Sequence, residues 1–223
     1  MIRPLSLLML VAGSALAPAA QGVCTGTPTL HDATSATIAA FVQQTGKKVL
    51  TFTGYSAAGY QDPETMREHA ARILAASSPA TALVNIGATA EGIGEIYELA
   101  KNAGFTTMGV VSSLARDEGI RLSPCVDHVF FVKDKTWGGL SPESGKLSPT
   151  SQAIVDISSS LVGIGGGDVA RDEMLAAQAR GKAVTFIPAD MNHQVARARA
   201  EKRNQPVPRD FRGSAHAALR TGK

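Results

Sequence analysis

The sequence contains little cysteine, few aromatic residues and none of several common catalytic motifs. Of its 223 residues, 5% are aromatic, two are cysteine and one is tryptophan. It has no GxSxG nucleophile elbow and no GxxxxGK phosphate-binding loop, which argues against an α/β-hydrolase and a P-loop NTPase. Neither cysteine has a neighbouring Cys or His, and the five histidines lack metal-ligand spacing, so we expect no metal and no cofactor.

Positive charge is concentrated at the C-terminus. The formal net charge is +3, but residues 195–223 carry eight Lys or Arg residues against two acidic residues. This tail therefore contributes +6 and residues 1–194 contribute −3, so the charge does not indicate a nucleic-acid-binding face on the folded domain. Because the tail also has Pro206, Pro208 and few apolar residues, the sequence predicts disorder after a short helix.

Residues 1–20 have the features of a secretory signal peptide. Arg3 precedes an apolar run over residues 5–12, and Ala17-Pro18-Ala19 provides a small-x-small cleavage pattern. The run is shorter than the roughly 20 residues that span a bilayer, so we expect a periplasmic or secreted protein without a stable membrane anchor. A buried N-terminal helix of a cytoplasmic protein is the alternative interpretation.

Export would also bear on the two cysteines. An oxidising compartment would permit Cys24 and Cys125 to pair. Two separate buried thiols are the alternative, because the sequence gives no distance between them.

Six short apolar runs alternate with segments of helical periodicity. The helix before the first run has Asp32 as its predicted cap, and Asp62-Pro63 opens the helix after it. Such alternation predicts an α/β fold with a doubly wound parallel sheet, as a Rossmann-like single domain over residues 21–194. The predicted strands cover residues 49–53, 82–86, 107–111, 129–132, 161–164 and 183–187.

Three glycine-bearing turns follow predicted strands and are the candidate ligand-binding elements. In a doubly wound sheet, ligands bind beyond the carboxyl ends of the strands, and glycine lets the backbone approach a phosphate at a helix N-terminus. We therefore predict that these turns bind the phosphate of a nucleotide; ordinary tight turns are the alternative. The predicted ligand-binding residues are Gly54 and Ser56, then Gly87, Thr89 and Gly92, and finally Gly165, Gly166, Gly167 and Asp168.

Glu173 is the candidate catalytic or ribose-binding residue. It follows the third turn closely enough for its carboxylate to face a ligand bound there. A carboxylate beside a phosphate is unfavourable unless it acts on a sugar hydroxyl or an anomeric carbon. The alternative is a solvated helix residue paired with Arg171 or Arg180. Trp137, followed by two glycines, is either a flap over a base ring or a loop anchor.

The segment from Leu161 to Pro188 resembles the signature of the SLOG superfamily. It combines an apolar strand, the glycines at 165–167, Glu173 and a second apolar strand. That superfamily includes the Lonely Guy (LOG) phosphoribohydrolases, also described as lysine-decarboxylase-like proteins, whose pattern is PGGxGTxxE. The resemblance extends from residue 48 to about 188 and implies a Rossmann-like fold, a nucleotide ligand and a homodimer.

The sequence departs from the LOG pattern in two places. Val169-Ala170 stands where that pattern has Gly-Thr, and Thr150-Ser151 stands where LOG enzymes carry an Arg-Lys pair. The Arg of the pair helps those enzymes hold the nucleotide at the reacting glycosidic bond. Its absence here favours binding without the LOG reaction.

Three functional hypotheses follow from these residues and the resemblance. The first is an exported SLOG-type protein that binds a nucleotide or nucleoside phosphate and no nucleic acid. The second is an N-glycosidic-bond hydrolase, similar to a phosphoribohydrolase or deoxyribosyltransferase, in which Glu173 acts at the sugar. The third is a secreted interaction module whose glycines shape turns and which binds no small ligand.

Overall fold

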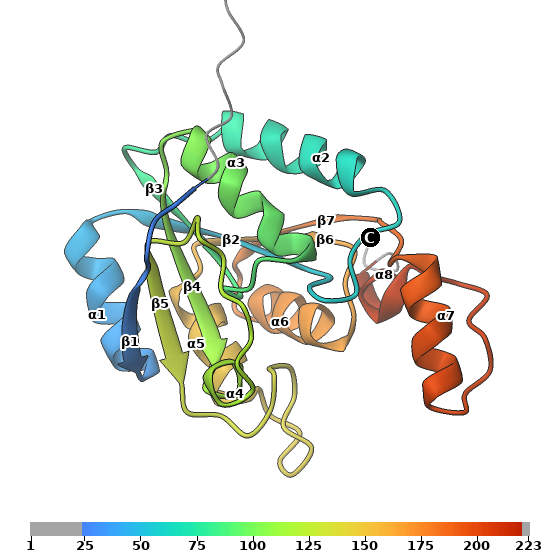
Figure 1. The fold of residues 1–223 in the computed structure, drawn as a ribbon. Coiled ribbons are helices and arrows are strands. Elements are labelled where there is room, and N and C mark those ends of the chain that lie inside the picture. The colour runs from blue at the N-terminus through green and yellow to red at the C-terminus, as the bar shows by residue number, and fades with distance from the viewer. Residues whose placement is uncertain (1–23, 220–223) are drawn as a thin grey trace, which may run out of the picture.

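A seven-stranded parallel β-sheet forms the centre of the protein (Figure 1). The computed structural model describes residues 24–219, so the predicted signal peptide lies outside the described residues. The strands are β1 (Thr29–Ala33), β2 (Lys48–Gly54), β3 (Ala82–Ile86), β4 (Thr106–Ser112), β5 (His128–Val132), β6 (Ser160–Ile164) and β7 (Ala183–Ile187). Their order in the sheet is β1-β5-β4-β3-β2-β6-β7, and every neighbouring pair is parallel.

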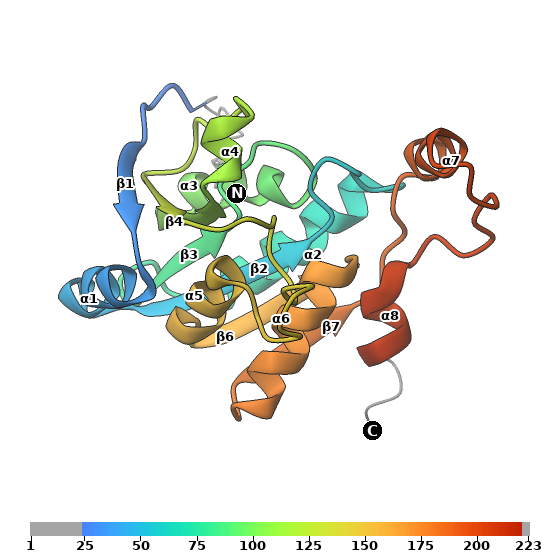
Figure 2. The same ribbon diagram turned by 90° about the horizontal axis from the view of Figure 1, so that it is seen from below.

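Helices cover both faces of this sheet. They are α1 (Ser35–Thr45), α2 (Pro63–Ala75), α3 (Ile96–Asn102), α4 (Leu114–Asp117), α5 (Pro149–Ile157), α6 (Asp168–Ala179), α7 (His193–Lys202) and α8 (Gly213–Leu219), with a 3₁₀ turn at Gly92–Glu95. Figures 1 and 2 show α2 and α3 on one face and α1, α5 and α6 on the other. One apolar core lies under each layer of helices. The predicted doubly wound, Rossmann-like domain is thereby confirmed.

No described helix combines the length and apolar character that crossing a membrane requires.

Capping residues set where the helices begin. The Asp62 carboxylate accepts a hydrogen bond from the Thr65 backbone N–H at 2.9 Å, and Pro63 occupies the first helical position of α2, as the sequence predicts. The cap of α1 differs from the prediction. Asp32 lies inside β1, and Thr34 is the N-cap, whose side chain accepts a hydrogen bond from the Thr37 backbone N–H.

β1 was not predicted from the sequence. Its residues are Thr-Leu-His-Asp-Ala, and most of its side chains are exposed or half-buried because β1 is an edge strand that pairs only with β5. An apolar run is typical of the buried central strands of a parallel sheet, whereas an edge strand does not need one. The strand therefore lacks the signal by which the other six were predicted.

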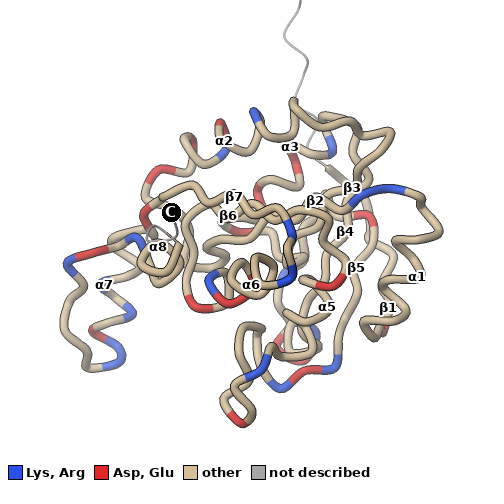
Figure 3. Tube along the Cα trace, turned by 180° about the vertical axis from the view of Figure 1, so that it is seen from behind, with Lys and Arg blue, Asp and Glu red and all other residues tan. Residues whose placement is uncertain are grey.

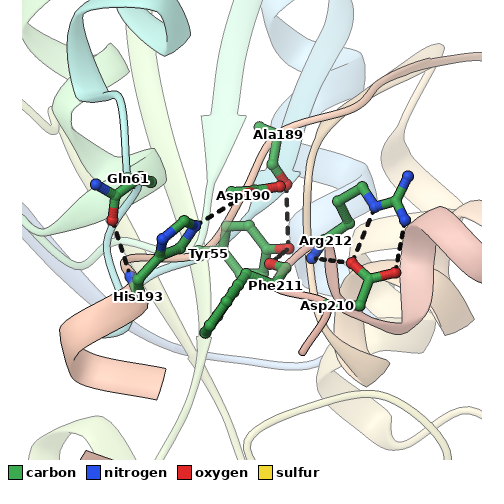
Figure 4. Close-up of polar contacts among 8 residues, drawn as sticks. All are labelled: Tyr55, Gln61, Ala189, Asp190, His193, Asp210, Phe211 and Arg212. Atoms are coloured by element: carbon green, nitrogen blue, oxygen red, sulfur yellow. Dashed lines mark hydrogen bonds and ion pairs between the residues drawn. The ribbon is translucent and has the colours of Figure 1, made fainter. Parts of the chain in front are cut away.

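The C-terminal segment also differs from the expectation of disorder after a short helix. α7 is the expected helix, but α8 follows it and packs against α6, with Ala215 and His216 buried. The Tyr55 hydroxyl donates to the carbonyls of Ala189 and Phe211 (Figure 4). The ring of His193 stacks on that of Phe211, with 4.0 Å between the ring centroids. Phe211 and the buried face of α8 thus place this basic segment against the rest of the fold.

Cys24 and Cys125 form a disulfide in the structure. The bond joins the segment before β1 to the loop before β5, and the two residues are 101 positions apart. Of the two alternatives that the sequence leaves open, the structure has the paired one.

Candidate functional site

A cavity of about 320 Å³ lies at the carboxyl ends of β2, β3 and β4. The chain runs from β2 through β3 and β4 to β5 on one side of the sheet and then returns to place β6 on the other side of β2. Ligands of open α/β sheets bind at such a reversal of strand order. We therefore take the cavity as the candidate site. Its lining residues on the strands and their turns include Thr51, Thr53, Gly54, Ser56, Asn85, Gly87, Thr89 and Val110, and those from other segments include Trp137, Thr150, Ile154, Val169 and Glu173.

Glu173 is the buried acid of this cavity. It lies in α6, and only 3% of its surface is exposed. The Ser151 hydroxyl donates to its Oε1 at 2.7 Å, and the Thr53 hydroxyl donates to its Oε2 at 3.1 Å. Burial raises the pKa of Glu173 to about 7, although the hydrogen bonds from Ser151 and Thr53 act in the opposite direction. The side chain therefore changes charge near neutral pH, as an acid–base group or a switchable acceptor requires.

The environment of Glu173 excludes the alternative of a solvated helix residue. Arg171 is paired with Asp168 and Asp172, and Arg180 is paired with Asp156. The carboxylate of Glu173 instead accepts hydrogen bonds from two hydroxyls, that of Ser151 in α5 and that of Thr53 in β2. Ser151 is itself fixed, because its oxygen accepts a hydrogen bond from the Gly139 backbone N–H at 2.7 Å.

A buried hydrogen-bond chain fixes the amide of Asn85. The Ser158 hydroxyl donates to the Ile154 carbonyl at 2.6 Å, so it must accept from the Thr51 hydroxyl, also at 2.6 Å. Thr51 then accepts from Asn85 Nδ2 at 3.2 Å. This order leaves Asn85 Oδ1 as a buried acceptor without a hydrogen-bond partner in the described residues. Buried unsatisfied polar atoms are rare in folded proteins, and Asn85 is one of the lining residues, so this oxygen is a candidate acceptor for a ligand donor.

The structure brings together five of the predicted site residues. Gly54, Ser56, Gly87, Thr89 and Glu173 all line the cavity, although they come from the end of β2, from the turns after β2 and β3, and from α6. Trp137, in the loop before α5, also lines it, with 44% of its surface exposed. This position agrees with the flap interpretation of Trp137.

The other predicted residues lie outside the cavity. Gly92 is buried in the 3₁₀ turn, where a Cβ would come within 2.3 Å of the carbonyl oxygens of Tyr55 and Ser56. Asp168 is exposed at the start of α6 and pairs with Arg171. Gly167 caps α6 and has open space around its Cβ position.

Gly165 and Gly166 are covered by the protein's own chain. A Cβ on Gly165 would lie 2.5 Å from the Tyr55 ring, and one on Gly166 would lie 2.5 Å from the Ala170 Cβ. The Gly166 carbonyl accepts a hydrogen bond from the Ala215 backbone N–H of α8 at 3.2 Å. Close packing of side chains and of α8 thus accounts for glycine at these two positions.

Several residues of the site were not predicted as ligand-binding or catalytic from the sequence. Thr51, Asn85 and Thr150 line the cavity, and Ser151 reaches it through its hydrogen bond to Glu173. The sequence marked Thr150 and Ser151 only as a departure from the LOG pattern. Thr51 and Asn85 face each other in the β2–β3 register and lie within otherwise apolar buried strands. A buried polar residue needs a hydrogen-bond partner, so a polar residue within an apolar strand was the sequence signal that could have indicated these two positions.

The charges around the cavity are mainly negative. None of the described residues that line it is Lys, Arg or His, whereas Glu91 and Glu173 are acidic. Glu91 pairs with the exposed Arg121 at 3.8 Å. Figure 3 shows Lys and Arg in α7 and in the loop before α5, and the lysines of that loop do not line the cavity.

No protein-family model matches the chain, and no curated protein matches its sequence. Among solved structures, it is similar to the molybdenum cofactor carrier protein from Chlamydomonas reinhardtii, with 22% identity and a TM-score of 0.45 over 63% of this chain and 76% of that chain. It is also similar to the molybdenum cofactor binding protein from Rippkaea orientalis, with 18% identity and a TM-score of 0.47 over 72% of this chain and 87% of that chain. A likeness this distant leaves the ligand to be argued from the chain's own residues, and the specific resemblance to LOG enzymes stays a prediction.

Proposed function

We propose that the protein binds a small molecule of the nucleoside or nucleotide class in the cavity at the ends of β2, β3 and β4. The observation that carries this proposal is the buried carboxylate of Glu173 in the wall of a cavity of about 320 Å³. Ligand sites in proteins have volumes of about 300–1,000 Å³ and are mostly apolar with a few fixed polar groups. The cavity fits this description.

The chemistry of the lining residues matches the parts of a nucleoside. The indole of Trp137 offers a flat surface on which a base can stack, and Ile154 and Val169 add apolar contacts. Glu173 accepts hydrogen bonds, as a ribose diol requires, and Asn85 Oδ1 lacks a donor that a base N–H would supply.

Export is part of the proposal. The disulfide between Cys24 and Cys125 supports it, because disulfides persist in oxidising compartments and are rare in cytosolic proteins. Mass spectrometry of the protein from the periplasm or medium of its host should find an N-terminus between roughly residues 18 and 25. An intact Met1 on cytoplasmic protein would contradict export.

Hydrolysis of an N-glycosidic bond is the second candidate function. It is favoured by the pKa of Glu173 of about 7, which suits a general acid or base at neutral pH. Against it, none of the described lining residues is a cation that would orient a leaving group or a phosphate. Binding without chemistry is therefore the primary proposal.

Fluorescence provides a direct binding assay, because Trp137 is the one tryptophan of the chain and lines the cavity. A panel of nucleosides and their monophosphates should quench or shift its emission with saturation. Molybdenum cofactor belongs in the panel, because it is the ligand named for the two similar structures. Binding of that cofactor with no response to any nucleoside or nucleotide would overturn the proposal.

Chromatography of the same mixtures distinguishes binding from hydrolysis. Release of free base by the wild-type protein, lost in Glu173→Gln, would make the protein a hydrolase. We expect no base release. Glu143→Gln, at an exposed position in the loop before α5, is the matched control, because it makes the same change at a residue that does not line the cavity.

A further inference from the structure

We propose that the cavity binds an uncharged nucleoside in preference to the corresponding monophosphate. This deepens the proposed function and rests on it, since it concerns which member of the ligand class the same site selects. Three features of the site support it: the charges in its wall, the charges at the start of α6, and the position of the glycine-rich turn after β6.

Among the described residues, none in the wall of the cavity is a cation that could bind a phosphate. Its charged residues are Glu91 and Glu173, and Glu173 is buried where water screens its charge poorly. A phosphate carries up to two negative charges, so its approach to an ionised Glu173 is repulsive. The exposed Arg121 does not remedy this, because Glu91 already pairs with it.

The start of α6 is also occupied by negative charge. Asp168 lies in the first turn of the helix, where its carboxylate already interacts with the positive end of the helix dipole. Arg171, the nearest cation in this helix, makes ion pairs of 2.7 Å with both Asp168 and Asp172. Its charge is therefore shared by two carboxylates, and the helix start adds no net attraction for an anion.

The glycine-rich turn, where the sequence predicts phosphate binding, is covered from one side by α8. The Gly166 carbonyl accepts a hydrogen bond from the Ala215 backbone N–H, and Gly165 packs against the Tyr55 ring. Neither glycine lines the cavity. The protein's own chain therefore takes up the space next to Gly165 and Gly166 that a bound phosphate would need.

A ribose diol, by contrast, matches the acceptors that the cavity provides. Each oxygen of Glu173 receives one hydroxyl donor from the protein, from Ser151 or Thr53, and a carboxylate oxygen can accept a second. Two neighbouring sugar hydroxyls would supply these second donors. Hydrogen bonds to an ionised carboxylate are stronger than those between neutral groups.

Titration of Trp137 fluorescence at pH 8 with adenosine, cytidine and their 5′-monophosphates tests the inference. We expect the preferred nucleoside to bind at least about tenfold more tightly than its monophosphate. The preference should shrink in Glu173→Gln, because the amide removes both the repulsion of phosphate and the charged acceptor for the diol. Glu143→Gln should keep the wild-type preference.

The outcomes separate this inference from the proposed function. Equal or tighter binding of the monophosphate would overturn the inference and leave the proposed nucleoside or nucleotide site intact. No response to these four ligands or to the rest of the nucleoside and nucleotide panel would overturn both. A preference for the nucleoside that is unchanged in Glu173→Gln would contradict the role of the Glu173 charge and with it the inference.

Discussion

Replacing Glu173 by glutamine should stabilise the protein at alkaline pH. Burial raises the pKa of this carboxyl from 4.5 to about 7, so the folded protein holds its proton more tightly than the unfolded chain does. The stabilisation from this proton is complete below pH 4.5 and is lost as the pH rises through 7. A difference of about 2.5 pKa units, at about 1.36 kcal/mol per unit, corresponds to about 3 kcal/mol of unfolding free energy.

The glutamine can keep most of the local hydrogen bonds. Ser151 can still donate to its carbonyl oxygen, and Thr53 can turn its hydroxyl to accept from the amide N–H. The side chain has nearly the same shape as glutamic acid and is never charged. The unfolding free energy of Glu173→Gln, relative to wild type, should therefore rise by up to about 3 kcal/mol from pH 4.5 to pH 8.

Urea denaturation with the disulfide intact, at pH 4.5, 6, 7 and 8, measures this difference. Glu143→Gln, which changes an exposed residue, should show no comparable pH dependence relative to wild type. A difference between Glu173→Gln and wild type that is constant over the pH range would refute the reasoning. It would mean that Glu173 titrates alike in the folded and unfolded states.

Three further predictions test the turn, the disulfide and the site. Gly166→Ala should lower the unfolding free energy by about 2–4 kcal/mol, because φ of Gly166 is +128° and the new Cβ would meet Ala170. Gly167→Ala should have little effect, because its Cβ position is open. Equal urea midpoints for the two variants would contradict this prediction. Replacing Cys24 and Cys125 by serine should cost about 2–5 kcal/mol, and an unchanged thermal midpoint would show that the bond is not formed. Nucleoside affinity, measured by the fluorescence titration, should fall tenfold or more from pH 8 to pH 5 as Glu173 is protonated. A higher affinity at pH 5 would instead indicate that protonated Glu173 donates a hydrogen bond to the ligand.

The six strands β2–β7 and the main helices could be predicted because their signals are local. β2, β3 and β6 are apolar runs that lie buried between two helix layers, and α2 and α5 each begin with a capping residue followed by a proline. β1 could not be predicted, because an edge strand of polar and half-buried residues resembles a loop in sequence. α8 could not be predicted either, since its order depends on contacts with α6.

The candidate site was predictable in part. Glu173 and the turns after β2 and β3 follow from the rule that ligands bind at the carboxyl ends of strands. Ser151 could not be found this way, because its role depends on the distance between α5 and α6. The sequence separation of Ser151 and Glu173 gives no indication that their side chains touch.

Glycine in a strand-to-helix turn admits two explanations, and only the three-dimensional surroundings choose between them. A turn that receives a phosphate and a turn that receives another part of the chain both require the absence of a Cβ. At Gly165 and Gly166 the neighbours are Tyr55, Ala170 and α8, so the protein itself occupies the space that a ligand would need. Polar residues in apolar strands are the more specific signal here, because Thr51 and Asn85 must find partners where burial is otherwise complete. If the proposed nucleoside site is correct, Asn85→Leu should weaken binding in the Trp137 titration while Gly167→Ala leaves it unchanged.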